Sequence, residues 1–276
     1  MAYSKEGIEQ MAAEYEATSK KRDAIFVLFM RHAFQNEKAY EYATQGYMRR
    51  LNTLLRCLQN VFTMLPPESV DVPKRDVLTD ATINLQAFLF NVFGCIDNLA
   101  WVWVHEHGWV HDKQINLPND KEINRLAVGL GPKSKGVRNT LSDNLRKYLE
   151  SLDGWFAGLG EYRDALAHRV PLYIPYALPE SKAAEYQKLS EEKLRASQAN
   201  DWTKYDKLDA AQNDLMEFRP QMTHSFAEAK GTLLFHAQLL ADFNLVAELG
   251  NRIMAELPNR NDASKASAAS AVENNT

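Results

Sequence analysis

LQAFLFNVFGCIDNLAWVWV, residues 85–104, is the stretch of sequence that decides the fold. A helix of about 20 residues spans a bilayer, but this one carries Asn91, Asp97 and Asn98, and no cluster of Lys and Arg flanks it. A helix that is apolar on nearly every side also forms at the centre of a bundle. We therefore predict that residues 76–107 form the central helix of a helical bundle, buried on most faces, with no membrane as a partner.

The composition of the whole chain agrees with a helical protein. Its 276 residues include only 12 glycines and 10 prolines, fewer than average, which argues against a turn-rich β fold and against an α/β fold with glycine loops. A molecule with a net charge of −4 does not attract nucleic acid as a whole, so such a partner needs local basic patches. Cys57 and Cys95 cannot form a disulfide framework, and the N-terminus lacks the pattern of a signal peptide. We therefore expect a cytoplasmic protein.

Helical patterns extend on both sides of the core stretch. Apolar residues over 40–65 recur at steps of three and four, the pattern of an amphipathic helix, and Pro66 ends it. Residues 108–136 contain several glycines and prolines and are expected to be mostly loop, with one short helix near 121–128. Further helices are predicted over 137–152 and 155–169, and PLYIPY, residues 171–176, is expected to be extended.

Residues 180–217 are rich in charge and poor in apolar side chains. Asn200 suits a helix C-terminus and Asp201 an N-cap, so we predict a charged helical hairpin that projects from the core and offers a surface to a protein partner. The capping-box pattern SFAE, residues 225–228, is expected to open a last helix that ends at 257. The predicted organisation is an all-α fold with one helical-bundle domain over 1–258, its core at 36–176 and 225–257, the hairpin at 180–217, and a disordered tail at 259–276.

The segment GEYRDALAHR, residues 160–169, carries residues suited to RNA cleavage without a metal. Asp164 and His168 are one helical turn apart and share a face, and Arg163 lies one step around the helix. A histidine is the natural base for the ribose 2′-hydroxyl near neutral pH, and an arginine stabilises the charge on the phosphorane. We therefore assign catalytic roles to Arg163, His168 and Asp164, the last holding the imidazole. The alternative is a simple ion pair at a helix end.

Arg163, followed by a polar residue and by His168, resembles the R-x4-6-H signature of the HEPN superfamily (higher eukaryotes and prokaryotes nucleotide-binding). The resemblance continues in FGCIDNLAW, residues 93–101, which is similar to the SALDxLAW helix of one bacterial branch, and in HRVPLY, residues 168–173. HEPN domains are small helical bundles, usually homodimers, and include toxin or defence ribonucleases as well as inactive binding modules. The resemblance therefore implies a HEPN-like bundle, a homodimer, a phosphate-facing Arg163 and a catalytic His168. Asp164 stands where Asn is commoner in the nucleases.

Two polar residues of the core stretch are candidates for supporting the catalytic groups. Asp97 lies in the most apolar helix, where a buried carboxylate needs a partner. It is expected to orient Arg163 or His168, or to pair with another arginine or a backbone donor. Asn98 follows it directly, and Asn91 and Asn98 share another face of the helix, so we expect these two to hydrogen-bond across a helix interface.

The richest basic stretch is predicted to follow an RNA backbone. It runs over residues 133–147, and its basic members are Lys133, Lys135, Arg138, Arg146 and Lys147. No metal site is expected at the histidines of residues 105–111, because Gly108 interrupts the helix between the two that have helical spacing. We also expect no cofactor.

The sequence as a whole predicts a HEPN-like, metal-independent endoribonuclease or RNA-binding protein of the toxin or defence type, acting as a homodimer. Two alternatives stay open. One is a catalytically silent helical interaction module. The other is a module that binds a small nucleotide through Arg163 and the basic loop.

Overall fold

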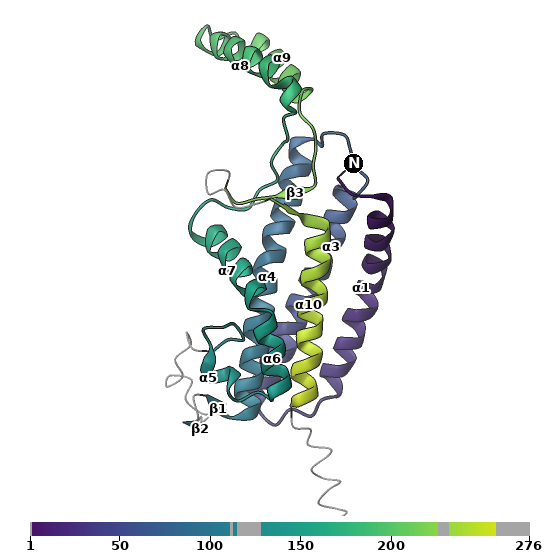
Figure 1. Ribbon diagram of the computed structural model, residues 1–276, viewed down its shortest axis with the longest axis vertical. Coiled ribbons are helices and arrows are strands. Elements are labelled where there is room, and N and C mark those ends of the chain that lie inside the picture. The colour runs from purple at the N-terminus through teal and green to yellow at the C-terminus, as the bar shows by residue number, and fades with distance from the viewer. Residues whose placement is uncertain (1, 111–112, 115–127, 226–231, 258–276) are drawn as a thin grey trace, which may run out of the picture.

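The computed structural model describes residues 2–110, 113–114, 128–225 and 232–257. The described chain is a helical bundle with two short pairs of strands (Figure 1), so the predicted all-α fold is confirmed. Four of the described helices pack together as the body of the bundle: α1 (Lys5–Arg31), α3 (Arg49–Met64), α4 (Arg75–His107) and α10 (Phe235–Glu256).

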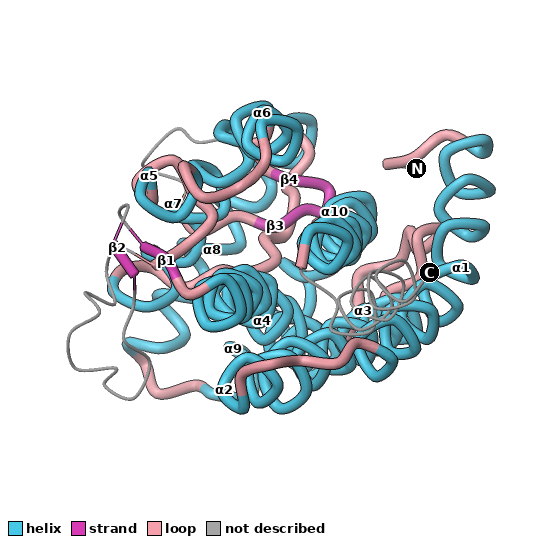
Figure 2. The backbone as a smooth tube through the Cα atoms, turned by 90° about the horizontal axis from the view of Figure 1, so that it is seen from below, coloured by secondary structure: helices cyan, strands magenta, loops and turns pink. Residues whose placement is uncertain are grey.

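Helix α4 is the central helix that the sequence predicts. It contacts α3, α7 (Asp153–His168) and α10, and the view from one end of the bundle places it beside α10 (Figure 2). By length and composition α4 is the one described helix apolar enough to cross a membrane, and 56% of its most apolar window is buried inside the bundle. One strip of α4 stays open, however, because Ile83 and Phe90 are 56% and 43% exposed and Asp97 is exposed as well. These three positions are seven residues apart and therefore lie along one side of the helix.

The predicted helix over 40–65 forms, but it is not α-helical throughout. Its first turn belongs to α2 (Glu37–Glu41), and the π-helix η1 (Tyr42–Met48) follows before α3 begins. Segments of π-helix are rare and frequently lie at functional sites. Here η1 contacts α4, and a Cβ at Gly46 would lie 2.8 Å from Cγ of Asn98, so the two helices approach closely at this glycine.

A second close approach joins α10 to η1 at Gly250. The ring of Tyr47 is fully buried against this glycine, and its hydroxyl donates to the Val246 carbonyl at 3.0 Å. A Cβ at position 250 would overlap the Tyr47 hydroxyl and lie 2.7 Å from Cζ of the ring. The absence of a side chain at Gly250 therefore lets α10 pack against η1.

We expect Gly250→Ala to lower the free energy of unfolding by about 1–3 kcal/mol, the usual effect of overpacking a core. Denaturation in urea measures the difference from the original protein. Gly154→Ala is the matched control, because a Cβ at Gly154 in the first turn of α7 would meet no neighbouring atom within 4 Å and alanine is the better helix former. Equal or higher stability of Gly250→Ala would contradict the close packing.

A buried histidine links the N-terminal segment to α10. The Nε2–H of His236 donates to the Leu65 carbonyl at 2.5 Å, and its Nδ1 accepts from the Tyr3 hydroxyl at 3.2 Å. The partners define this tautomer, because a carbonyl oxygen only accepts. Burial lowers the pKa of His236 to about 4, although the bond to Leu65 opposes the shift. His236 is therefore neutral at neutral pH.

The helices on the other side of α4 are shorter than the sequence suggests. The predicted helix over 137–152 is two helices, α5 (Lys135–Arg138) and α6 (Asp143–Ser151). Ser142 separates them, because its hydroxyl accepts from the N–H of Leu145 at 3.1 Å and so caps α6. The predicted extended segment that follows α7 pairs with a second chain segment through the isolated bridges Tyr173–Thr223 and Ala177–Glu217.

Two antiparallel strand pairs connect the helices: β1 (Trp109–Val110) with β2 (Lys113–Gln114), and β3 (Gln221–Met222) with β4 (Leu233–Leu234). The second pair corrects the prediction that the last helix opens at 225–228. Helix α10 begins at Phe235, because pairing with β3 keeps the preceding residues extended and the Phe235 N–H donates to the Pro220 carbonyl at 3.1 Å. Residues 226–228, most of the predicted helix near 121–128 and the predicted tail at 259–276 lie outside the described residues.

The predicted charged hairpin is confirmed. It consists of η4 (Glu180–Lys182), α8 (Ala183–Gln198) and α9 (Trp202–Asn213), and it projects from one end of the bundle (Figure 1). Asn200 adopts a left-handed φ of 56°, and Asp201 caps α9 by accepting from the N–H of Lys204 at 3.0 Å. Both residues therefore act as the sequence predicts.

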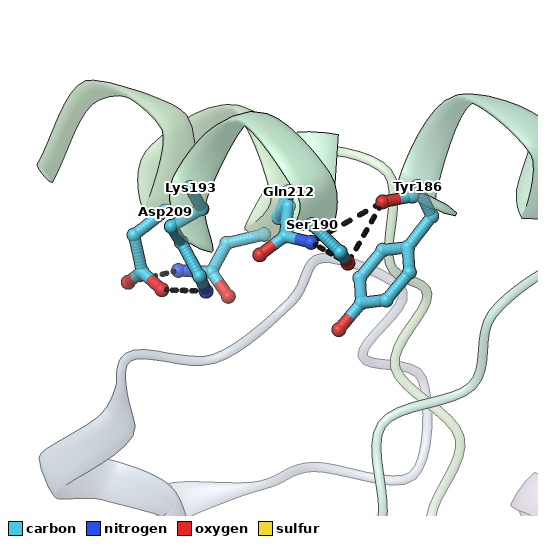
Figure 3. Close-up of polar contacts among 6 residues, drawn as sticks. Tyr186, Ser190, Lys193, Asp209 and Gln212 are labelled. Atoms are coloured by element: carbon cyan, nitrogen blue, oxygen red, sulfur yellow. Dashed lines mark hydrogen bonds and ion pairs between the residues drawn. The ribbon is translucent and has the colours of Figure 1, made fainter. Parts of the chain in front are cut away.

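Polar side chains join the two helices of the hairpin (Figure 3). The Nζ of Lys193 donates to Oδ1 of Asp209 at 2.8 Å, and this bond lowers the pKa of Asp209. The buried Gln212 donates to Oγ of Ser190 at 2.5 Å and to the Tyr186 carbonyl at 3.3 Å. The hairpin is therefore held by contacts within itself.

Candidate functional site on α4 and α7

The end of α7 carries the three residues of the predicted catalytic motif. The Nη1 of Arg163 lies 3.2 Å from Oδ1 of Asp164, and His168 is exposed as the last residue of the helix. No hydrogen bond joins Asp164 to His168 within the described residues. About 7.5 Å along the helix axis separates the backbone positions of Arg163 and His168.

The guanidinium of Arg163 lies over an aromatic ring of the neighbouring helix. Its Cζ is 4.5 Å from the ring centroid of Phe93 in α4, and the Arg163 side chain is 36% exposed. The Nε of Arg163 is buried without a hydrogen-bond partner among the residues described. A cation–π contact positions a guanidinium through its face and leaves its N–H groups for other partners. Arg163 is therefore held over Phe93, with its Nη1 beside the Asp164 carboxylate.

Asp97 lies near two arginines from different helices. Desolvation raises the pKa of Asp97, and the positive charges of Arg163 and Arg50 oppose this shift. The prediction of a buried carboxylate is wrong, because Asp97 belongs to the open strip of α4 and is exposed. Asp97 is therefore a surface carboxyl that feels the charges of two arginines.

Arg50 is a candidate that the sequence analysis missed. From α3 its Nε donates to Oδ1 of Asn98 at 3.0 Å and its Nη1 donates to Oδ1 of Asn91 at 3.1 Å. The predicted hydrogen bonding of the two asparagines across a helix interface is therefore confirmed. Gly94 leaves room for this arginine, because a Cβ there would lie 2.5 Å from Cζ of Arg50. A glycine inside a core helix is the sequence signal that indicates such a close neighbour.

Arg138 is not part of a surface that contacts RNA, which corrects the prediction for this residue. It is 5% exposed. Its Nε donates to the Leu130 carbonyl at 2.8 Å, and its Nη2 lies 2.7 Å from Oδ1 of Asp153. The segment before α5 folds around the guanidinium, so Arg138 stabilises that segment from inside the protein.

The other residues of the basic stretch lie at the surface. Lys133, Lys135 and Lys147 are exposed, and Arg146 is half-buried with its Nη2 2.6 Å from Oδ1 of Asp143. No contact within the described residues joins these side chains to the end of α7. The structure therefore keeps the basic stretch apart from the motif, as a separate candidate for contact with RNA.

The histidines at the end of α4 stack on aromatic rings. His105 is buried, with its ring centroid 5.4 Å from that of Trp101. His107 lies 4.9 Å from the ring of Trp103, and burial lowers the pKa of His107. His111 lies outside the described residues. These contacts give His105 and His107 a place in the packing of the helix.

Comparison with known proteins does not place the chain in a family. No family model matches it, and neither the curated proteins nor the solved structures include a significant match. The structure itself defines the class of protein: an all-α bundle that carries an arginine and a histidine at the end of α7, with Asp97 exposed on its central helix.

Proposed function

We propose that the protein binds RNA at the Arg163–His168 end of α7 and cleaves it without a metal, as a HEPN-like endoribonuclease. One observation carries this proposal: Arg163, fixed over Phe93, shares a helix with an exposed histidine that has no partner within the described residues. The pair supplies a cation suited to phosphate and an imidazole that can act as a base. Cleavage through the ribose 2′-hydroxyl requires both groups.

In the proposed reaction His168 takes the proton from the 2′-hydroxyl. The 2′-oxygen attacks the adjacent phosphorus, Arg163 stabilises the charge on the phosphorane, and the 5′-oxygen leaves with a proton from water. The product therefore ends in a 2′,3′-cyclic phosphate. The charge of Asp97 acts on Arg163 and on Arg50, and Asn98 holds Arg50 in place.

A homodimer is part of the proposal. Ile83 and Phe90 expose an apolar strip on the helix that carries Phe93. Burial of such side chains against a second copy stabilises an assembly, so we propose that this strip is the contact between two copies. Light scattering at micromolar concentration is expected to give the mass of a dimer, and a monomer would contradict this part of the proposal.

We place the activity in the cytoplasm. Cys57 and Cys95 are both free and buried, and burial raises the pKa of Cys57 to about 11. Such a thiol stays protonated and unreactive near neutral pH. The free thiols therefore suit a reducing compartment.

Incubation of the purified protein with mixed RNA in EDTA tests the proposed function. We expect cleavage that leaves 2′,3′-cyclic phosphate ends, and we expect DNA of the same sequence to stay intact because it lacks the attacking hydroxyl. Cleavage that stops in EDTA would contradict a mechanism without metal. An intact dimer that cuts no RNA would favour an interaction module instead.

The second candidate function, a helical module that binds a partner protein, is supported by exposed apolar side chains on the hairpin. Leu194 and Trp202 are 60% and 57% exposed on α8 and α9. Large apolar side chains on a projecting element are suited to contact with a partner protein. The ion pair with Asp164 also reduces the positive charge that Arg163 offers to a phosphate. These observations keep a silent binding role as the second candidate function.

A further inference from the structure

A cavity of about 190 Å³ lies between α4, α7 and α10. Most of its wall is apolar and includes Leu85, Phe88 and Leu89 of α4 and Trp155 and Leu159 of α7. None of the three residues of the predicted catalytic motif lines it. An apolar cavity of about 150 Å³ in another protein binds benzene, so this volume is sufficient for one small organic molecule.

Among the residues that the structure describes, one charged side chain reaches the cavity. Asp242 of α10 is 5% exposed and forms part of the wall. Its Oδ1 accepts from Nε1–H of Trp155 and from Nε2 of Gln238, each at 2.8 Å. Within the described residues nothing donates to Oδ2 and no cation pairs with the carboxylate. One oxygen of a buried carboxyl is therefore left for something other than the chain.

The two donors do not explain why this residue is charged. An asparagine oxygen would accept the same two hydrogen bonds without burying a charge. Burial raises the pKa of Asp242 to about 6, so the carboxyl is still mostly ionised at neutral pH. Burying a carboxylate without a cation costs free energy. A cation from outside the chain would reduce this cost by pairing with Asp242.

A glycine keeps one wall of the cavity open. Trp155, Gly158, Leu159 and Tyr162 line the cavity from the same face of α7. A Cβ at Gly158 would meet no neighbouring atom within 4 Å. The space beside Gly158 is therefore available to an occupant, and a larger side chain at this position would take it up.

We propose that this cavity binds a small organic amine, with its ammonium group on Oδ2 of Asp242 and its apolar body between α4 and α7. The volume limits the apolar part to about the size of one aromatic ring. The apolar wall and the single anionic group select against anions and against sugars, whose hydroxyl groups would find few partners. The site thus accepts a compact apolar molecule with one cationic end.

Titration calorimetry of the full chain with benzylamine and with benzyl alcohol tests the proposal. The two probes have nearly the same shape, but only the amine is charged at neutral pH. We expect benzylamine to bind at least about tenfold more tightly, because a hydrogen bond between charged groups is stronger than a neutral one. We also expect the indole N–H resonance of Trp155 to shift when benzylamine binds, because this group donates to the same carboxyl.

Two variants test separately the role of the Asp242 carboxylate and the role of the space beside Gly158. Asp242→Asn is expected to remove the preference for benzylamine while benzyl alcohol still binds. Gly158→Leu is expected to abolish the binding of both probes by filling the cavity. Gly154→Leu is the matched control on the same helix, because Gly154 does not line the cavity and a Cβ there also meets no neighbour within 4 Å. This control is expected to bind both probes as the original protein does.

Several results would overturn the proposal. They are equal affinity for the two probes, an unchanged preference in Asp242→Asn, or unchanged binding in Gly158→Leu. If Gly158→Leu does not fold, the Trp155 resonance of the original protein decides the question, and the absence of a shift at millimolar benzylamine would exclude the site.

Discussion

Replacement of His168 by alanine is expected to slow the proposed RNA cleavage by about 10²- to 10⁴-fold, the usual effect of removing a general base. The loss arises because His168 is the group that takes the 2′-hydroxyl proton in the proposed reaction. Initial rates on a defined RNA in EDTA measure the effect. The stability of the variant should stay within about 0.5 kcal/mol of the original, because His168 is exposed and makes no contact that its removal would break.

Two further substitutions make the test specific for this mechanism. Arg163→Lys keeps the charge over Phe93 but loses the planar fork that binds two phosphate oxygens, so most of the activity should disappear. Asp164→Asn removes the carboxylate that lies 3.2 Å from Arg163, so activity should be retained or rise. If cleavage persists in His168→Ala, another part of the chain performs the reaction. If Asp164→Asn is inactive, the aspartate has a role that its ion pair does not reveal.

Asp242 and His236, both on α10, are expected to produce opposite pH dependences of stability. Burial raises the pKa of Asp242 from 3.8 to about 6, so its contribution to stability is fully present below about pH 4 and is lost as the pH rises through 6. Burial lowers the pKa of His236 from 6.5 to about 4, so its contribution is present above pH 6.5 and is lost as the pH falls through 4. A pKa shift of this size, about two units, changes the free energy of unfolding by about 3 kcal/mol. The two effects therefore nearly cancel between pH 4 and 7.

Single substitutions should expose each effect. Relative to the original protein, Asp242→Asn should be more stable at pH 7 by about 3 kcal/mol and equally stable at pH 4, because it removes the buried charge. His236→Gln, whose amide reproduces the donor to Leu65, should gain relative stability as the pH falls from 7 to 4. Urea denaturation across this range measures both differences, and the comparison cancels the titration of all other groups. Differences that do not vary with pH would show that neither group titrates as its burial implies.

The side chains that contact Asp242 and His236 carry no charge, so the pH dependence of stability can be assigned to these two residues. Asp242 is bonded by the neutral Trp155 and Gln238. His236 contacts the Leu65 carbonyl and Tyr3, and burial raises the pKa of Tyr3 to about 12, so this phenol stays neutral over the whole range. No charged side chain described here therefore competes with either group.

Local signals predicted much of the fold. The apolar run of α4 and the pair Asn200 and Asp201 act through neighbours in sequence, and the structure confirms them. The π-helix could not be predicted in this way, because nothing in its local pattern shows that Gly46 lies against Asn98. The start of α10 was also missed, since pairing of β3 with β4 decides it over a distance in sequence.

Less of the candidate site could be predicted from the sequence, because several of its contacts join residues that are far apart in the chain. Arg163 and His168 stand out because one helix spaces them. Arg50 does not stand out in the sequence, because its partners Asn91 and Asn98 belong to another helix. Arg138 was assigned to RNA because charge patterns do not distinguish a surface arginine from one whose donors are used inside the protein.

The hairpin leaves the bundle and returns to it at a single place. Ala177 and Glu217 face each other there, joined by two backbone hydrogen bonds of 3.0 and 2.7 Å. The polar contacts between α8 and α9 stay within the hairpin (Figure 3). In evolutionary terms the hairpin has the form of an insertion: its two ends already meet, so a lineage could lengthen, exchange or lose it while the helices around α4 keep their packing.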